Sequence, residues 1–166
     1  MSVQNLYNDE AKKKIKELAE SIDFTMLVTD LKTQPFHTIP MSTKEVDEQG
    51  NIWFLSNKNS THNANIEREN RAHLVYSDKG DMEFLSVYGR ATIGTDRNRI
   101  KELYGKSDDA WFEGEDDPNI TTIMVQPDDA NYWDTKNGKI VSLLKMAGGA
   151  ITGNEPDMGV EGELKI

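Results

Sequence analysis

The chain has 166 residues, enough for one domain that buries about 70% of its unfolded surface and folds without disulfides or bound metal. Its 36% hydrophobic content and 12 glycines are near the globular average and exclude an integral membrane protein, while the absence of cysteine excludes disulfide scaffolds, thiolate metal sites and cysteine nucleophiles. The formal net charge of −10 disfavours nucleic acid as a partner, because such a protein repels phosphate backbones.

The first predicted element is a helix over residues 8–21. Asn8 is expected to cap it, with Asp9 and Glu10 at the positive end of the helix dipole. Four apolar residues fall on one helical face, namely Ile15, Leu18, Ala19 and Ile22. No apolar run typical of a signal sequence follows the first basic residues, so the expected location is the cytoplasm.

After this helix the apolar period changes to two. Residues 24–29 alternate as a strand does, residues 36–45 stay extended because Pro40 would break a helix, and residues 52–55 are a run of β formers. The connections between these strands are predicted at residues 32–35 and 47–51.

Two further helices and four strands are predicted in the remainder. Ser60 opens a helix of about ten residues, and Asp96 caps a second helix that runs to Tyr104. The acidic residues 108–118, around Trp111, are expected to form a loop or short helix. The strands are predicted at residues 72–76, 84–93, 120–125 and 130–133.

These elements predict a mainly β (α+β) fold in a single domain that spans residues 1–166. Roughly seven strands are joined mostly by tight turns, which is typical of an antiparallel sheet or barrel with short peripheral helices. Regular β–α alternation is missing, so a parallel nucleotide-binding sheet is disfavoured. Residues 139–166 are expected to form a C-terminal extension.

Most of the candidate catalytic and metal-binding motifs do not have the residue spacing that their chemistry requires. The three histidines, at positions 37, 62 and 73, do not have the spacing of a metal site, and no serine has the setting of a nucleophile. No metal ligand and no catalytic residue is therefore predicted. The acidic segment 108–117 lacks EF-hand spacing, and the glycine-rich segment 148–153 lacks the lysine of a phosphate loop.

Residues 55–62 are the exception, because they combine phosphate-binding groups between a strand and a helix. Ser and Thr hydroxyls, Lys58, His62 and the free N–H groups of a helix start are what a phosphate monoester needs. The plainer interpretation is an N-capped helix and nothing else.

An ordered set of short motifs resembles the flavin-binding split barrels of the pyridoxamine 5′-phosphate oxidase superfamily, in particular the general stress protein branch. No single motif is specific, but their order covers nearly the whole chain. The motifs are Ile39-Pro40-Met41, residues 47–54, Ser60-Thr61-His62, Ala110-Trp111-Phe112, Asp116-Asp117-Pro118, Tyr132-Trp133-Asp134, Leu143-Leu144-Lys145-Met146 and residues 152–159.

The resemblance implies a six- to seven-stranded antiparallel split β-barrel that forms a homodimer and holds FMN, or FAD, at the dimer interface. Met41, Ser42 and Thr43 would lie along the flavin ring. The phosphate would be held by Ser56, Ser60, Thr61 and His62, and Trp111 or Trp133 would cover the ring from the partner subunit. The cofactor-binding residues implied are Pro40, Met41, Ser42, Thr43, Leu55, Ser56, Asn57, Ser60, Thr61, His62, Trp111 and Trp133.

Three departures from the family pattern leave two functions open. Ile39 stands where the branch has arginine, His62 where it has lysine, and the apolar residues 139–143 where the oxidases have a basic run that grips pyridoxal phosphate. The first hypothesis is a flavin-dependent oxidoreductase of unknown substrate without that clamp. The alternative is a cofactor-free dimeric binding or stress-response protein with a decayed flavin site. A third option is haem binding, which would need a histidine or a tyrosine as the axial ligand of the iron.

Overall fold

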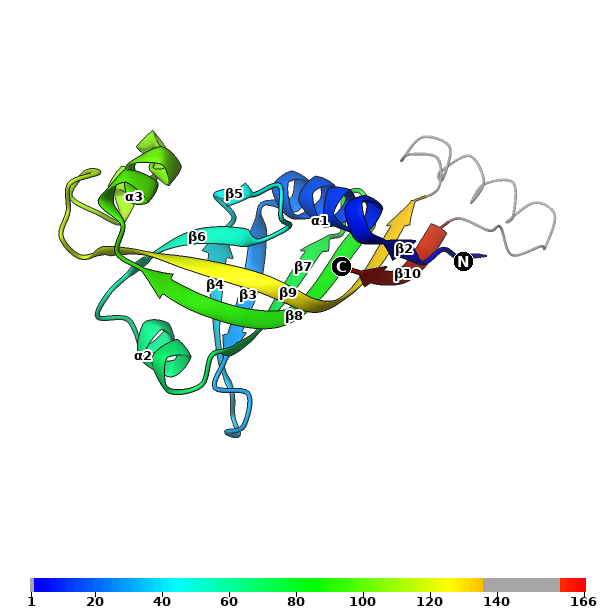
Figure 1. Cartoon of the computed structure of the whole chain (residues 1–166), viewed down its shortest axis with the longest axis horizontal. Coiled ribbons are helices and arrows are strands. Elements are labelled where there is room, and N and C mark those ends of the chain that lie inside the picture. The colour runs from blue at the N-terminus through cyan, green and yellow to red at the C-terminus, as the bar shows by residue number, and fades with distance from the viewer. Residues whose placement is uncertain (1, 136–158) are drawn as a thin grey trace.

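A curved, mostly antiparallel sheet forms the body of the protein in a computed structural model, which describes residues 2–135 and 159–166 (Figure 1). The strands are β1 (Ser2–Val3), β2 (Leu6–Tyr7), β3 (Phe24–Thr29), β4 (His37–Ser42), β5 (Glu45–Val46), β6 (Ile52–Asn57), β7 (Arg71–Asp78), β8 (Glu83–Gly94), β9 (Ile120–Thr135) and β10 (Gly159–Lys165). The helices are α1 (Asn8–Ile22), α2 (Thr61–Arg68), α3 (Arg97–Leu103) and the 3₁₀ helix η1 (Lys106–Ala110).

The long strand β9 joins two parts of the sheet. Its first part pairs with β6 and its last part with β10, while β8 pairs along most of its length. The main path of hydrogen-bonded strands runs β1-β10-β9-β8-β7-β3-β4, and β5 pairs with β6. Within the described residues no ladder joins β4 to β6, so the sheet curves without closing. The predicted split-barrel fold class is therefore confirmed.

The prediction of separate strands at residues 120–125 and 130–133 is wrong. These residues belong to one 16-residue strand, β9. The register with β8 shifts at a bulge, where Tyr88 faces Asp129 and Gly89 faces Pro127, so that Asp128 is the extra residue. The bulge accommodates a proline, which cannot donate to a ladder, inside a sheet.

The sequence analysis also missed the strands at the two ends of the described chain. The short strands β1 and β2 both pair in parallel with β10, which in turn pairs antiparallel with β9. Their residues form strands because β10 supplies a partner from the other end of the chain. Figure 1 shows the two termini close together. Of the predicted extension over residues 139–166, residues 159–165 form β10 and residues 139–158 lie outside the described part.

Helix α1 covers one side of the sheet with the predicted apolar stripe. Of the predicted stripe, Ile15, Leu18 and Ala19 are buried in the main core together with Ala11, whereas Ile22 is half-buried and packs against this core. The prediction that Asn8 caps this helix is wrong, because Tyr7 occupies the N-cap position and no side chain caps it. The caps predicted for the other two helices are confirmed, since Ser60 and Asp96 accept bonds from Asn63 and Asn98.

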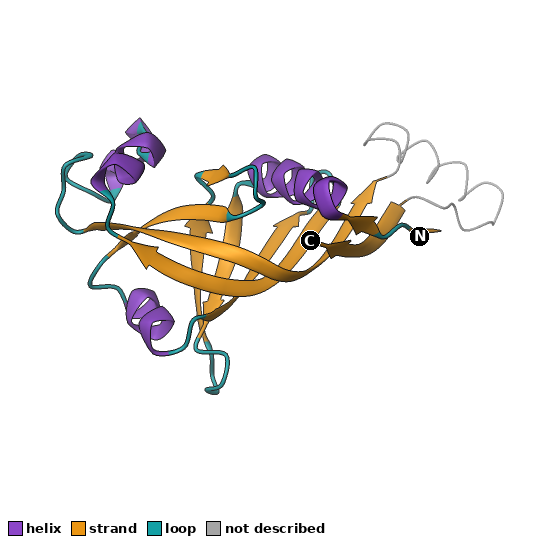
Figure 2. Cartoon of the chain, in the orientation of Figure 1, coloured by secondary structure: helices purple, strands orange, loops and turns teal. Residues whose placement is uncertain are grey.

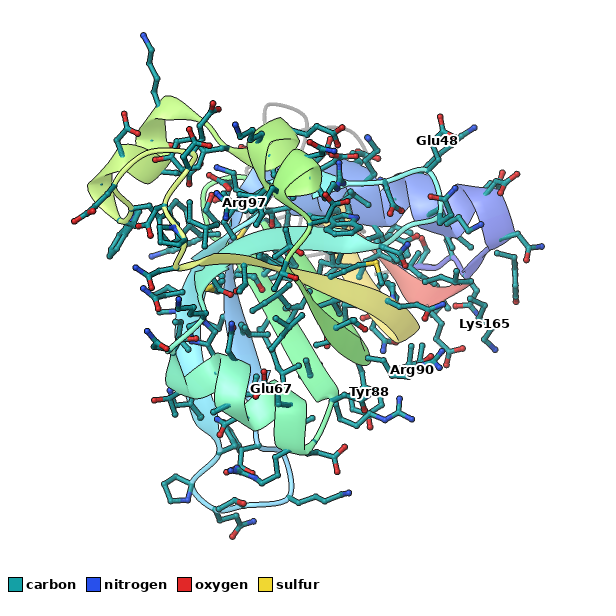
Figure 3. All side chains as sticks on the ribbon, turned by 60° about the vertical axis from the view of Figure 1, so that its left-hand side comes forward. Glu48, Glu67, Tyr88, Arg90, Arg97 and Lys165 are labelled. Carbon is teal, nitrogen blue, oxygen red and sulfur yellow. The ribbon has the colours of Figure 1, made fainter. Side chains whose placement is uncertain are left out.

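Helices α2 and α3 lie at the same end of the sheet but on opposite sides of β6 and β9 (Figures 1 and 2). Figure 3 shows the same arrangement through Glu67 of α2 and Arg97 of α3. Below α3 lies a second, smaller core cluster formed by Leu55, Ile100, Leu103 and Ile120. Among the described residues, none of the helices has the length and apolar content to cross a membrane.

Candidate functional site

The start of α2 brings several polar groups of the predicted phosphate site together. Strand β6 ends at Asn57, whose side chain accepts a bond from the N–H of Asn59 at 2.9 Å and so forms the turn into the helix. Ser60 caps α2 by accepting the N–H of Asn63 at 3.2 Å. Lys58 and Thr61 are exposed at this end. A helix start with hydroxyls and a lysine favours an anion.

His62 lies beneath this helix start and is 7% exposed. Its Nε2 atom is buried and has no hydrogen-bond partner among the described residues. Burial, and then the charge of His37, lower the pKa of His62 to about 4. The ring is therefore neutral near pH 7, and it carries a polar atom that the chain does not satisfy.

His37, at the start of β4, is the neighbour of His62. The two ring centroids are 6.4 Å apart and the ring planes are inclined by 26°. The Nδ1 atom of His37 is also buried without a partner among the described residues. The sequence analysis missed this residue, because the two histidines are far apart in the sequence and only the fold stacks them.

Ser56 is occupied by a buried network that holds α2 onto the sheet. Its hydroxyl lies 2.8 Å from the side-chain oxygen of Asn63 and 2.8 Å from the hydroxyl of Thr121. The Asn63 amide donates to Thr121 at 2.9 Å, which joins α2 to β6 and β9. Ser56 therefore positions the start of α2.

Strand β4 and the next residue, Thr43, are the part of the chain predicted to line the flavin ring, and β4 is an edge strand of the described sheet. Pro40 is exposed and Met41 is buried in the main core. The hydroxyl of Ser42 donates to Asp23 at 2.7 Å, and that of Thr43 lies 2.9 Å from the Tyr76 hydroxyl. The outer edge of β4 offers backbone N–H and C=O groups to a ligand.

Three residues of the predicted set lie apart from this region. Leu55 packs in the small cluster under α3, on the side of β6 away from α2. Trp111 follows η1 and is 81% exposed. Trp133 is half-buried on β9, where it faces Phe84 of β8. Within one chain, the structure does not bring either tryptophan to the start of α2.

The fixed cations near these residues are mostly paired. Lys44 and Asp108 form a largely buried ion pair at 2.7 Å, and Arg68 bonds Asp30 at 3.0 Å. Ile39, at the position where the family resemblance implies an arginine, carries no charge and packs against the main core. Among the described residues, the positive groups at the start of α2 are thus Lys58 and the helix N–H groups. In the described part of the chain, no three His, Asp or Glu residues are placed to hold a metal ion.

Comparison with known proteins identifies relatives over most of the chain. A family model described as pyridoxamine 5′-phosphate oxidase like matches residues 10–157. Protein bli-3 of Neurospora crassa is 25% identical over 154 residues, which cover 84% of this chain and 74% of that protein. General stress protein 26 of Bacillus subtilis is 28% identical over 87 residues, 50% of this chain and 62% of that protein.

Solved structures show the same fold. A general stress protein 26 structure from Jannaschia sp. CCS1 has a TM-score of 0.79 at 24% identity and covers 95% of this chain and 98% of its own. The general stress FMN/FAD binding protein of Xanthomonas citri has a TM-score of 0.65 at 27% identity and covers 76% of this chain and 90% of its own.

Proposed function

Because the chain belongs to the pyridoxamine 5′-phosphate oxidase-like family, we propose that it binds a flavin, FMN or FAD, with the cofactor's phosphate at the start of α2 and its ring along β4. The observation that carries this proposal is the buried Nε2 of His62, which has no partner among the described residues and lies under a capped helix start. The similarity to a protein described as FMN/FAD binding supports it.

The residues at the start of α2 fit the phosphate of a flavin by donor type. Ser60, Thr61 and the N–H groups of the first helical turn are donors, and Lys58 adds an exposed positive charge. The fit is poorer in fixed charge, because Ile39 packs on the core and His62 is neutral near pH 7. We therefore expect the affinity to depend strongly on the flavin ring.

Strand β4 would serve the ring end of the cofactor. Its outer edge provides backbone groups for the polar edge of the ring, and the exposed Pro40 provides an apolar surface. A bound flavin supplies the electron or hydride transfer of an oxidoreductase. The chain contributes binding and orientation, and the proposal names no substrate. Residues 139–143, which replace the oxidase clamp for pyridoxal phosphate, lie outside the described part.

We also propose that the protein is a homodimer formed through the outer face of β3, β4 and β7. Phe24, Met26 and Val75 are 62%, 40% and 43% exposed there, and Met26 lies opposite both Val75 and Pro40. An apolar sheet face next to the proposed ring site suits a second copy, which would complete the site. The apolar residues Phe54 and Leu55 of β6 do not offer such a face, because both are buried within the chain.

A cofactor-free dimeric binding or stress-response protein is the second candidate. One observation favours it: the pKa of His62, lowered to about 4, leaves no positive side chain at the position where the branch has lysine. A site without fixed charge is what loss of phosphate binding would leave behind.

Equilibrium titration with FMN and FAD, followed by flavin fluorescence, distinguishes the two functions. We expect saturable quenching with one flavin per chain. Thr61→Asp should weaken FMN binding more than tenfold, because it places a carboxylate beside the phosphate. Asn70→Asp, beyond the other end of α2, is the matched control and should change affinity less than twofold. Absence of binding by either flavin would support the cofactor-free candidate.

The dimer is tested by sedimentation of the wild type and two lysine variants. We expect the wild type to sediment as twice the 18.8 kDa chain, and Met26→Lys to sediment as a monomer. Val3→Lys, at a residue that is 72% exposed on β1, is the control and should remain dimeric. A monomeric wild type would refute the dimer.

A further inference from the structure

Two histidine rings lie side by side next to the start of α2, and each carries a buried nitrogen that has no partner in the described chain. The two nitrogens are Nδ1 of His37, from β4, and Nε2 of His62, from α2, on rings 6.4 Å apart. A buried polar atom costs free energy until something bonds it. Two such atoms from different elements indicate that the fold reserves this position for an external partner.

We propose that His37 and His62 act together as the proton-accepting floor of a phosphate-monoester site, so that binding of the monoester places one proton on the histidine pair. The proposal rests on the flavin site proposed above and assigns a role to His37, which no sequence motif indicates. Before the monoester binds, Ile39 is apolar and His62 is neutral, so neither offers a positive charge to the phosphate. The proton that the histidine pair takes up on binding supplies that charge.

In the described part of the chain, few charged groups act on the histidine pair, and the two nearest, Asp30 and Arg68, form an ion pair with each other. The electrostatic influence on His62 among described residues is that of His37, and it lowers the pKa of His62 together with burial. Beyond His37 lie Asp30, at the end of β3, and Arg68, on α2, which bond each other at 3.0 Å. Strand β8 also packs on α2 but adds no charge that acts on His62. Lys58 lies at the exposed mouth.

The proton can come from two sources, depending on pH. A phosphate monoester has its second pKa near 6. Below this pH the ligand carries the proton, so its O–H bond breaks and an N–H bond forms on the pair, with no net uptake. Above this pH the ligand is a dianion, and the same proton is taken from solvent.

This balance sets the pH dependence of binding. The affinity for the monoester should be nearly constant between about pH 5 and 6, and should then fall by up to tenfold per pH unit. It should level off above the pKa of the pair in the complex. For the fall to be visible, the bound dianion must raise the pKa of His62 from about 4 to above 6, a coupling of at least about a hundredfold.

FMN and riboflavin, which differ only in the phosphate, are the probes for the experiment. Their Kd values are measured by fluorescence from pH 5.5 to 8. For the wild type we expect the Kd of FMN to rise at least tenfold above pH 6, while that of riboflavin stays constant. His62→Lys should remove the rise. His37→Phe, which keeps an aromatic ring, should weaken FMN at least tenfold at pH 6 and leave riboflavin unchanged.

The outcomes separate this proposal from the flavin site itself. If both flavins bind with the same pH profile, or if His37→Phe binds FMN as the wild type does, the proton-accepting pair is wrong although the flavin site stands. If neither flavin binds, the flavin site is wrong. The pair is then decided by NMR titration of the imidazoles in inorganic phosphate against chloride at equal ionic strength. An unchanged pKa for His62 refutes the pair, and a raised pKa supports it.

Discussion

His62 is a polar residue whose surroundings disfavour its charged form. It is the second residue of α2, two positions after the cap residue Ser60, yet it is only 7% exposed. The desolvation of the ring outweighs any benefit of a charged imidazole, and the nearby His37 adds to this effect. The residue at the position where the family resemblance implies a lysine is therefore a neutral base near pH 7.

This depressed pKa makes the stability of the fold depend on pH. The unfolded chain protonates His62 near pH 6.5 and the folded chain near pH 4, so the unfolded state binds more protons between these values. The stabilisation is complete above pH 6.5 and is lost as the pH falls. From pH 7 to 4.5 we expect the wild type to lose about 2–3 kcal/mol more than His62→Phe. Urea denaturation of both proteins at the two pH values measures this difference, and equal losses would contradict it.

At the scale of elements, two structural features fix the position of the candidate site. The network of Ser56, Asn63 and Thr121 fastens the start of α2 to β6 and β9. The bulge at Gly89 lets β8 and β9 stay paired past Pro127, while Arg90 bonds the extra residue Asp128 at 3.2 Å. Strand β9 thus continues past the bulge, and β6 and β10 pair with its two ends.

Gly89 is required for this close approach. A Cβ atom there would lie 2.1 Å from the backbone oxygen of Gln126. We expect Gly89→Ala to destabilise the protein by about 2–3 kcal/mol or more, because the backbone must shift to relieve the clash. Gly105→Ala is the matched control, since its nearest contact would be 3.8 Å away, and should cost less than about 0.5 kcal/mol. Thermal or urea unfolding compares the two, and equal effects would count against the close contact.

At the scale of the whole molecule, net charge opposes the proposed assembly. Each chain carries a formal charge of −10, so two copies repel each other, while the apolar residues Phe24, Met26 and Val75 favour contact. The stability of the proposed dimer therefore depends on whether burial of the apolar face outweighs the long-range repulsion between the two negatively charged chains. Such a balance responds to ionic strength.

We expect added salt to strengthen the dimer. Screening shortens the range of the repulsion to about 10 Å at 0.1 M salt, whereas apolar contact is not weakened. The dissociation constant, measured by sedimentation equilibrium, should fall severalfold between low and physiological ionic strength. A dimer that dissociates as salt is added would instead indicate an interface held by ion pairs.

The sequence by itself determined the local elements and the family. The sequence pattern predicts the helix stripe of Ile15, Leu18 and Ala19, the caps at Ser60 and Asp96 and the alternation in β3, because these features depend on neighbours within a few residues. The mainly β fold class followed from these elements and the short connections. The ordered motifs indicated the family, which the match over residues 10–157 establishes.

Only the tertiary structure decided what depends on distant partners. Strands β1, β2 and β10 exist because the two ends of the described chain pair with each other, and β9 stays paired with β8 across the bulge that β9 forms at Asp128. The same holds for the site. Ser56 proved to be tied up by Asn63 and Thr121, and His37 was brought to His62, by contacts across the sheet. Burial and hydrogen-bond satisfaction are properties of the assembled fold, and a linear pattern does not contain them.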